Sequence, residues 1–144
     1  DCVPILLFDR GKSIIAAVHA GWRGTAKGVL KKTVEEMMSK FRSNPKDILM
    51  ATGPAIRWCC YAVGEDVLKA VRKETGKGEY FMKKNGNTCL DLPTANKIQA
   101  LSMGIPEHHI WMAEECTLCH PERFYSYRHS KKTTGRQGGF IGLP

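Results

Sequence analysis

The chain contains 144 residues, of which 42% are hydrophobic and 25% are charged, values typical of one globular domain that buries a core. No stretch approaches the roughly 18 consecutive apolar residues of a membrane-spanning helix, and the first residues lack the basic and apolar regions of a secretion signal. Six cysteines, two of them adjacent, do not resemble a secreted disulfide framework. We therefore predict a cytoplasmic protein that has no membrane partner.

The formal net charge of +8 is compatible with two kinds of partner. A basic surface attracts nucleic acid. The basic residues, however, are spread along the chain and lack the interleaved aromatic residues of a single-strand binder. Solvated surface and a site for a small anion such as phosphate explain the charge better. A basic nucleic-acid-binding or scaffold module is the non-enzymatic alternative.

Hydrophobic periodicity and turn residues predict an α+β fold without internal repeats or a dividing linker. The expected elements, in chain order, are a strand over 1–8, a hairpin turn over 9–12, a strand over 13–18, a helix over 25–41, a strand over 48–52, a short helix over 65–73, a mobile loop over 76–86, a strand over 88–91, a helix over 93–103, and strands over 110–113, 124–127 and 140–143. Thr25 is the expected N-cap of the first helix, whose apolar stripe indicates packing on a sheet. Pro93 opens the last helix and Gly104 closes it.

Cys2 and His19 form the first candidate site. The turn over 9–12 folds the chain back and is expected to place both residues at the same end of two paired strands. A thiolate beside an imidazole is either half of a soft-metal site or a nucleophile with its base. Catalytic zinc takes three protein ligands, so a third would come from elsewhere. For His19, a core histidine hydrogen-bonded to backbone is the structural alternative.

Asp91 and the segment Phe124-Tyr-Ser-Tyr-Arg128 are expected to form another wall of the pocket. Arg128 would end a strand there, and Arg23 could approach from the other side. A guanidinium group binds phosphate through two parallel hydrogen bonds, which favours both arginines as phosphate ligands. Structural ion pairs are the alternative for the arginines. For Asp91 the alternative is a carboxylate at the N-terminus of the 93–103 helix.

Cys116-Thr-Leu-Cys119-His120 matches the attachment pattern of covalent haem and the spacing of half a zinc site. Haem attachment would need export, a distal axial ligand and an apolar pocket, none of which the sequence indicates. A second Cys-x-x-Cys pair is absent, because Cys59 and Cys60 are adjacent and Cys89 stands alone. We therefore interpret the motif as two cysteines in a turn.

An ordered series of motifs extends along the whole chain. The series runs Asp1-Cys2-x-Pro4, His19-Ala-Gly-Trp-Arg-Gly24, Gly53-Pro-Ala-Ile56, Cys60-Tyr-x-Val-Gly64, Leu90-Asp-Leu92, Cys116-Thr117, Phe124-Tyr-Ser-Tyr-Arg128 and Gly135-Arg136. It resembles the YfiH family, formerly described as polyphenol oxidases or laccases and now as purine nucleoside phosphorylases and adenosine deaminases. The resemblance implies β-sheets sandwiched with helices, a fold similar to that of a Cys-His toxin deamidase.

The family's zinc site uses two histidines and one cysteine, and two of these ligands fall on Cys2 and His19. The third is a histidine that precedes the Asp-Cys element. We therefore expect this sequence to start within the domain and to cover its C-terminal two-thirds as one incomplete unit.

The resemblance implies a zinc-dependent purine nucleoside phosphorylase that acts on adenosine, inosine and S-methyl-5′-thioadenosine and also deaminates adenosine. Cys2 and His19 would be the metal-binding and catalytic residues. The candidates for binding phosphate are Arg23, Arg128 and Arg136. Two other enzymes stay open: a cysteine hydrolase in which Cys2 is the nucleophile and His19 its base, and a copper-dependent polyphenol oxidase, for which five histidines are few.

Overall fold

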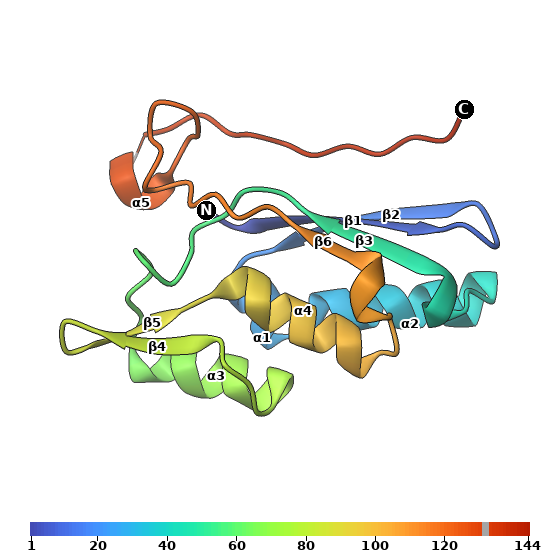
Figure 1. Cartoon of the computed structure of the whole chain (residues 1–144), viewed down its shortest axis with the longest axis horizontal. Helices are drawn as coiled ribbons and strands as arrows, with labels where there is room; N and C mark the ends of the chain where they lie inside the picture. The colour runs from blue at the N-terminus through green and yellow to red at the C-terminus, as the bar shows by residue number, and fades with distance from the viewer. Residues whose placement is uncertain (131–132) are drawn as a thin grey trace.

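The computed structural model of the chain describes residues 1–130 and 133–144 and shows the predicted α+β fold (Figure 1). Its elements in chain order are β1 (Val3–Asp9), β2 (Ile14–Ala20), α1 (Trp22–Ala26), α2 (Val29–Phe41), η1 (Pro45–Asp47), β3 (Ile48–Thr52), α3 (Glu65–Thr75), β4 (Phe81–Lys84), β5 (Asn87–Leu90), α4 (Leu92–Ser102), η2 (Glu107–His109), β6 (Ile110–Met112) and α5 (Tyr127–Ser130). No helix among the described residues is both long and apolar enough to cross a lipid bilayer.

The centre of the fold is a four-stranded sheet in the order β2-β1-β3-β6. β1 is antiparallel to both β2 and β3, whereas β6 is parallel to β3. Along β1, buried and partly exposed residues alternate, which is the two-residue period of a strand with one face in the core. Val3, Ile5 and Leu7 are fully buried, so the residues between them lie on the outer face of the sheet.

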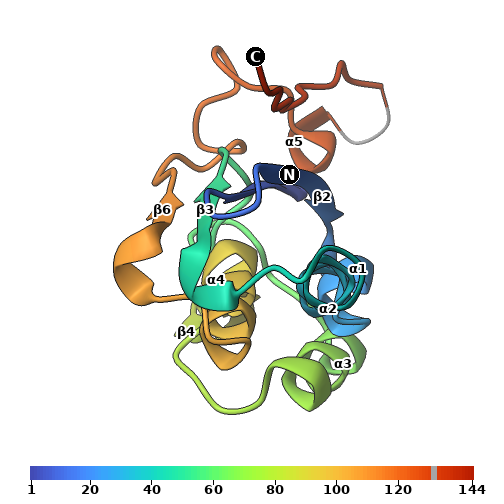
Figure 2. The same ribbon diagram turned by 90° about the vertical axis from the view of Figure 1, so that its right-hand side faces the viewer.

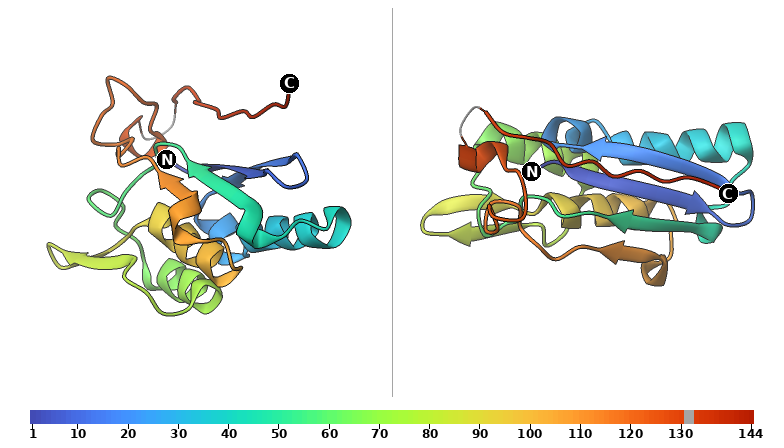
Figure 3. Two further views of the ribbon diagram at one scale, coloured as in Figure 1. Left: turned by 45° about the vertical axis from the view of Figure 1, so that its right-hand side comes forward. Right: turned by 90° about the horizontal axis from the view of Figure 1, so that it is seen from above.

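Helices α1 to α4 lie on one face of this sheet, and α5 and the C-terminal segment lie on the other (Figures 1 and 2). α2 buries Leu30, Val34 and Met37, whose spacing forms one stripe of the helix. α3 packs against α1, on the side of the helical layer away from the sheet. Residues 133–144 run back along the outer face of β1 (Figure 3). The outer face of the sheet is therefore not covered by the layer of helices α1 to α4.

The prediction of one helix over 25–41 is wrong in its N-terminal part. The structure has two helices in this region, α1, which ends at Ala26, and α2, which begins at Val29. Thr25 lies inside α1, is fully buried and accepts a hydrogen bond from Asn96 Nδ2 at 3.0 Å. Gly28 separates α1 from α2 in the left-handed conformation, with a φ of 67°. Thr25 thus binds a partner in the core, and Gly21 stands at the N-cap of α1 instead.

The expected mobile loop over 76–86 contains a strand. β4 pairs antiparallel with β5, and Asn85 and Gly86 form the turn between them. Their φ values of 48° and 75° are typical of a tight hairpin turn. Three of the four residues of β4 are exposed, so the sequence lacks the apolar alternation that would have indicated a strand.

Two strands expected near the C-terminus are also wrong. Ser126 begins a short helix instead, because its Oγ accepts a hydrogen bond from the N–H of His129 at 3.1 Å. The segment 140–143 is not in a strand, and its Phe140 is 92% exposed. A strand needs a neighbour that completes its backbone hydrogen bonds, and neither sheet of the described residues includes this segment.

Candidate functional site

The β1–β2 hairpin brings Cys2 and His19 to one end of the sheet. Pro4 is opposite His19 in the ladder, so Cys2, two residues before Pro4, lies on the same face and one step further along. Both Cys2 and His19 are exposed, whereas Val18 and Ala20 are buried. The pairing confirms that the two residues meet at one end of the hairpin, and the exposure of His19 is contrary to a core histidine.

Gly21 allows the Cys2 thiol to approach the junction between β2 and α1. A Cβ atom added at Gly21 would lie only 2.7 Å from Cys2 Sγ. Because β2 ends at Ala20 and α1 begins at Trp22, this glycine is the whole connection between them. The thiol therefore packs on the junction that directly follows His19 and Ala20.

Two arginines and a tyrosine lie beside Cys2. The Arg128 guanidinium is 5.2 Å from the centre of the Tyr61 ring, and its Nη2 donates to the Ala62 carbonyl at 3.4 Å. Burial raises the pKa of Tyr61, the charges of Arg128 and Arg23 oppose this shift, and that of Cys2 adds to it. The Arg128 backbone N–H bonds Asp1, which precedes Cys2, and Arg23 follows Gly21, against which the Cys2 thiol packs. We call Cys2, Arg23, Tyr61 and Arg128 the Tyr61 cluster.

The three candidate arginines differ in how they are held. Arg23 is exposed and its guanidinium lies 4.5 Å from the centre of the Trp22 ring. Arg136 is also exposed, and its Nη1 donates to the carbonyls of Thr134 and Gly135, both at 2.9 Å. None of the three arginines pairs with a carboxylate side chain in the described part of the chain, contrary to the alternative of structural ion pairs for Arg23 and Arg128.

The residue before Cys2 is held by two distant segments. The Asp1 carboxylate accepts a hydrogen bond from Thr117 Oγ1 and another from the Arg128 N–H, each at 2.8 Å. Its carbonyl accepts a third from the N–H of Ile56 at 2.9 Å. These bonds fix the backbone next to Cys2, so the loop after β3 and the segment after β6 both position the candidate site.

Asp91 has a structural position. Its Oδ1 accepts from the Thr94 N–H at 3.0 Å and caps α4, which confirms the alternative of a helix N-terminal carboxylate. Its Oδ2 accepts from Arg57 Nε at 2.9 Å, and only 3% of the Asp91 side chain is exposed. Arg57 Nη1 also donates to the carbonyl of Ala113 at 3.1 Å. Because the carboxylate is buried and engaged on both oxygens, we assign Asp91 to the scaffold of the site and not to its wall.

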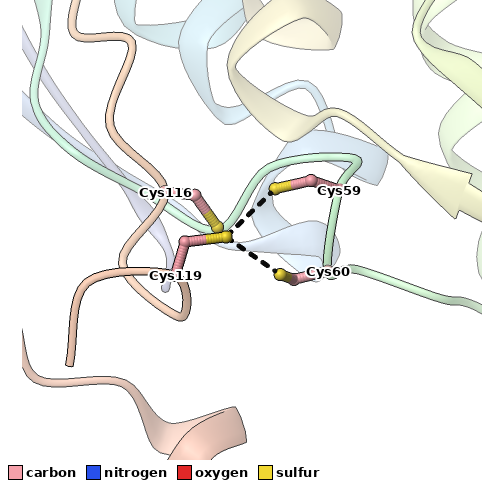
Figure 4. A group of neighbouring side chains, drawn as sticks. All are labelled: Cys59, Cys60, Cys116 and Cys119. Atoms are coloured by element: carbon pink, nitrogen blue, oxygen red, sulfur yellow. Dashed lines mark hydrogen bonds between the residues drawn. The ribbon is translucent and has the colours of Figure 1, made fainter.

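Four cysteines from the loop after β3 and the loop after β6 converge (Figure 4). The Sγ atoms of this cysteine cluster, Cys59, Cys60, Cys116 and Cys119, all lie within 4.8 Å of one another. Cys119 Sγ is 3.5 Å from that of Cys59 and 3.3 Å from that of Cys60. Within residues 1–130 and 133–144, this is the one group of three or more His, Cys, Asp or Glu side chains placed so that it could hold a metal ion.

The thiols of the cysteine cluster differ in acidity. Burial raises the pKa of Cys59, and it raises that of Cys60 to about 11. Burial acts on Cys116 in the same direction, but hydrogen bonds outweigh it and lower the pKa of this thiol. The donors that do so include the backbone N–H groups of Arg57, Cys119 and Leu118.

The sequence interpretation of two cysteines in a turn missed this cluster. It required a second pair with the same spacing, whereas the structure supplies the adjacent pair Cys59-Cys60. The two segments meet because Ala55 forms a parallel bridge with Cys116 and accepts a hydrogen bond from the Thr117 N–H at 3.1 Å. The signal in the sequence was the presence of two cysteine pairs, irrespective of their spacing.

Comparison with known proteins identifies the family. Residues 1–144 match the family described as multi-copper polyphenol oxidoreductase laccase, and the chain belongs to this family. It is 40% identical over 144 residues to a purine nucleoside phosphorylase of Deinococcus radiodurans, and 38% identical over 153 residues to the purine nucleoside phosphorylase YlmD of Geobacillus stearothermophilus. It is also 34% identical over 146 residues to the adenosine deaminase RL5 of an unknown prokaryotic organism.

The match covers nearly all of this chain and about half of each relative. The shares are 100% of the chain and 54% of the Deinococcus protein, 99% and 53% for the Geobacillus protein, and 99% and 55% for RL5. The crystal structure of YlmD from Geobacillus stearothermophilus superposes with a TM-score of 0.88 at 37% identity, over 94% of this chain and 51% of that one. These matches confirm the predicted resemblance to the YfiH family and its fold.

Proposed function

We propose that the protein carrying this chain is a zinc-dependent purine nucleoside phosphorylase that acts on adenosine, inosine and S-methyl-5′-thioadenosine and also deaminates adenosine. The names of its relatives support an enzyme of this class. The structural observation that carries the proposal is the Tyr61 cluster, in which two arginines lie beside the end of the hairpin that exposes Cys2 and His19.

Cys2 and His19 offer donors that fit zinc. Thiolate and neutral imidazole are both zinc ligands, and here both are exposed on one face of one hairpin. The resemblance implies that a histidine preceding the Asp-Cys element completes the set. When bound, zinc would supply a Lewis acid and lower the pKa of a bound water.

The arginines suit the second substrate of a phosphorylase. In phosphorolysis an oxygen of phosphate bonds to C1′ of the ribose, and the bond from C1′ to the purine breaks with its electron pair passing to the purine, which takes up a proton. The guanidinium groups of Arg23 and Arg128 would hold the phosphate through paired hydrogen bonds. Arg136 is a third candidate for this contact. Because the guanidinium groups would already be in position, they would stabilise the attacking phosphate without a reorganisation of the surrounding water.

Tyr61 is our candidate for a hydrogen-bond donor in the same site. The ordinary pKa of tyrosine, about 10, already leaves the phenol protonated at neutral pH, and burial raises the pKa of Tyr61 further. In deamination the oxygen of water bonds to C6 of adenosine and the bond from C6 to the amino nitrogen breaks. One proton of the water leaves with the nitrogen as ammonia, and the other stays on the inosine that forms. A site that binds a purine nucleoside beside an activated water can therefore serve both reactions.

The copper oxidase has less support than the phosphorylase, although the family description names it. Copper centres of oxidases rely on imidazole ligands. In the part of the chain that the structure describes, the only grouped set of potential metal ligands consists of four cysteines and contains no histidine. The cysteine hydrolase uses the same Cys2 and His19, so an experiment has to separate it from the phosphorylase.

Dependence on phosphate tests the proposal. The purified protein is incubated with inosine or adenosine, with and without phosphate, and the products are separated by chromatography. We expect free purine and ribose 1-phosphate in equal amounts when phosphate is present and neither when it is omitted. Cys2→Ala and His19→Ala are each expected to abolish the reaction and to remove about one zinc ion per chain, since a catalytic site has no spare ligand.

A control and two contrary outcomes complete the test. Arg10→Lys changes a basic residue in the turn at the other end of the hairpin and should leave turnover unchanged. Base release that needs no phosphate would reject the phosphorylase, and covalent labelling of Cys2 by an acyl or amide substrate would then establish the hydrolase. Zinc retained in full by both Cys2→Ala and His19→Ala would reject the metal ligands.

A further inference from the structure

We propose that the cysteine cluster is a second metal site, separate from Cys2 and His19, which holds one zinc ion in tetrahedral thiolate coordination. Its four ligands would be Cys59, Cys60, Cys116 and Cys119. The ion would tie the loop after β3 to the loop after β6. This inference does not depend on the proposed phosphorylase activity.

The spacing of the sulfur atoms fits a single ion. Zinc bound by four thiolates has Zn–S distances of about 2.3 Å, which puts the sulfurs about 3.8 Å apart along the edges of a tetrahedron. Cys119 Sγ lies 3.3 Å from Cys60 Sγ and 3.5 Å from Cys59 Sγ, slightly less than this value. No two of the four sulfurs are more than 4.8 Å apart, which is slightly more than it. Iron–sulfur clusters place several atoms between their cysteines and need wider spacing. The geometry therefore favours a mononuclear site.

A backbone N–H group is directed at one of the sulfurs. The N–H of Arg57 donates a hydrogen bond to Cys116 Sγ at 3.4 Å. A donor of this kind orients a ligating sulfur and stabilises its negative charge. Cys116 thus already has a hydrogen-bond partner suited to a metal ligand.

One cation lies beside the proposed ligands. One zinc ion with four thiolates carries a formal charge of about −2, so nearby positive charge is favourable. Lys84 Nζ donates to the carbonyl of Cys59 at 2.7 Å.

The ion would stabilise a segment that has little regular structure. Residues 53–64 contain isolated bridges, at Ala55 and Ala62, and no named strand or helix. The same segment supplies Tyr61 and the N–H of Ile56 that holds Asp1. Cross-linking this segment to the Cys-x-x-Cys turn would therefore fix the groups that surround Cys2. A depression of about 590 Å³, lined in part by Cys116 and Cys119, gives the ion a path from solvent.

Cobalt substitution tests the site in the protein that carries this chain. Metal is removed, Co²⁺ is added in steps, and the charge-transfer absorption from thiolate to cobalt is recorded. In the Cys2→Ala/His19→Ala variant we expect about one tightly bound ion per chain with the intensity of four thiolates. That variant separates this site from the one in the proposed function, because it removes both of those ligands.

Zinc competition then identifies the ligands. Cys60→Ser should remove one thiolate from the cobalt spectrum and weaken zinc binding at least about tenfold. Cys89→Ala is the matched control, because Cys89 is a buried cysteine outside the cluster, and it should change neither quantity. The spectrum of the Cys2→Ala/His19→Ala variant decides the question even if Cys60→Ser does not fold.

Three results would overturn the proposal. The first is a cobalt form without a thiolate charge-transfer band. The second is loss of all tightly bound metal in Cys2→Ala/His19→Ala. The third is a metal-free protein whose mass is lower by the hydrogens of one or two disulfides, since the four thiols would then be paired with one another and not with zinc.

Discussion

Thr117 Oγ1 donates a hydrogen bond of 2.8 Å to the carboxylate of Asp1, a residue 116 positions earlier in the chain. The bond joins the segment after β6 to the residue that precedes Cys2. Thr117 itself is fully buried, and its own N–H bonds the carbonyl of Ala55. The residue next to Cys2 is thus held by a segment that is distant in the sequence.

Thr117→Val tests this link, because it keeps the shape of the side chain and removes the hydroxyl. We expect a loss of about 1–2 kcal/mol in the free energy of unfolding, since a charged acceptor loses a donor in a buried place. Catalytic turnover should fall by more than the increase in the unfolded fraction of the protein explains. Urea denaturation and turnover are measured on the same samples, and Thr117→Ser is the control that restores the hydroxyl. Equal stability of Thr117→Val and wild type would contradict the assignment.

Asp91→Asn should destabilise the protein by about 3 kcal/mol. It leaves the Arg57 guanidinium, with a side chain only 17% exposed, without its carboxylate partner. The comparison is Lys40→Gln, which breaks the exposed Glu36–Lys40 pair on α2 and should not shift the unfolding midpoint measurably. Similar shifts in the two variants would show that burial of the Arg57–Asp91 pair is irrelevant.

Gly28→Ala should cost about 1–2 kcal/mol of stability for two reasons. Gly28 has a φ of 67°, and an added Cβ would lie 2.6 Å from Glu74 Oε1, which forms an ion pair with Lys31 at 2.8 Å. Gly86→Ala separates the two effects, because Gly86 also has a positive φ but no atom within 4 Å of the added Cβ. Thermal unfolding should therefore show the larger loss at position 28. A second change, Glu74→Ala, should recover part of it.

Arg128→Lys keeps the positive charge and removes the planar guanidinium group. We expect the KM for phosphate to rise about tenfold, with the zinc content unchanged, because a lysine cannot make the paired hydrogen bonds. The backbone N–H of residue 128 still holds Asp1 in this variant. Initial rates over a range of phosphate concentrations provide the measurement. An unchanged KM for phosphate, together with salt-sensitive binding of DNA or RNA, would favour the nucleic-acid module instead.

Tyr61 should make stability fall in alkaline solution. Burial raises its pKa in the folded protein, whereas the unfolded chain ionises near its ordinary value of about 10. Above about pH 10 the unfolded state releases this proton first, so the free energy of unfolding decreases until the folded pKa is passed. Tyr61→Phe should lose this component, and the difference in stability between the two proteins should therefore depend on pH above 10. A difference in the free energy of unfolding that stays constant above pH 10 would contradict a raised pKa of Tyr61.

Much of the fold could be predicted from local pattern. The strand over 48–52 has the predicted bounds, and the apolar runs of the hairpin led to β1 and β2 within two residues at each end. The failures have different causes. Thr25 is bound by Asn96, a residue 71 positions away, and local pattern carries no information on such a partner. Ser126 has a local partner three residues on, the N–H of His129, and β4 exposes most of its residues.

The sequence by itself determined the family, the α+β class and the meeting of Cys2 with His19, because a hairpin is a local structure whose register follows from one turn. Only the tertiary structure assembled the cysteine cluster, the Arg57–Asp91 pair and the contacts of Asp1. Each of these joins residues more than thirty positions apart, and such contacts form only when the core packs the segments that carry them against one another.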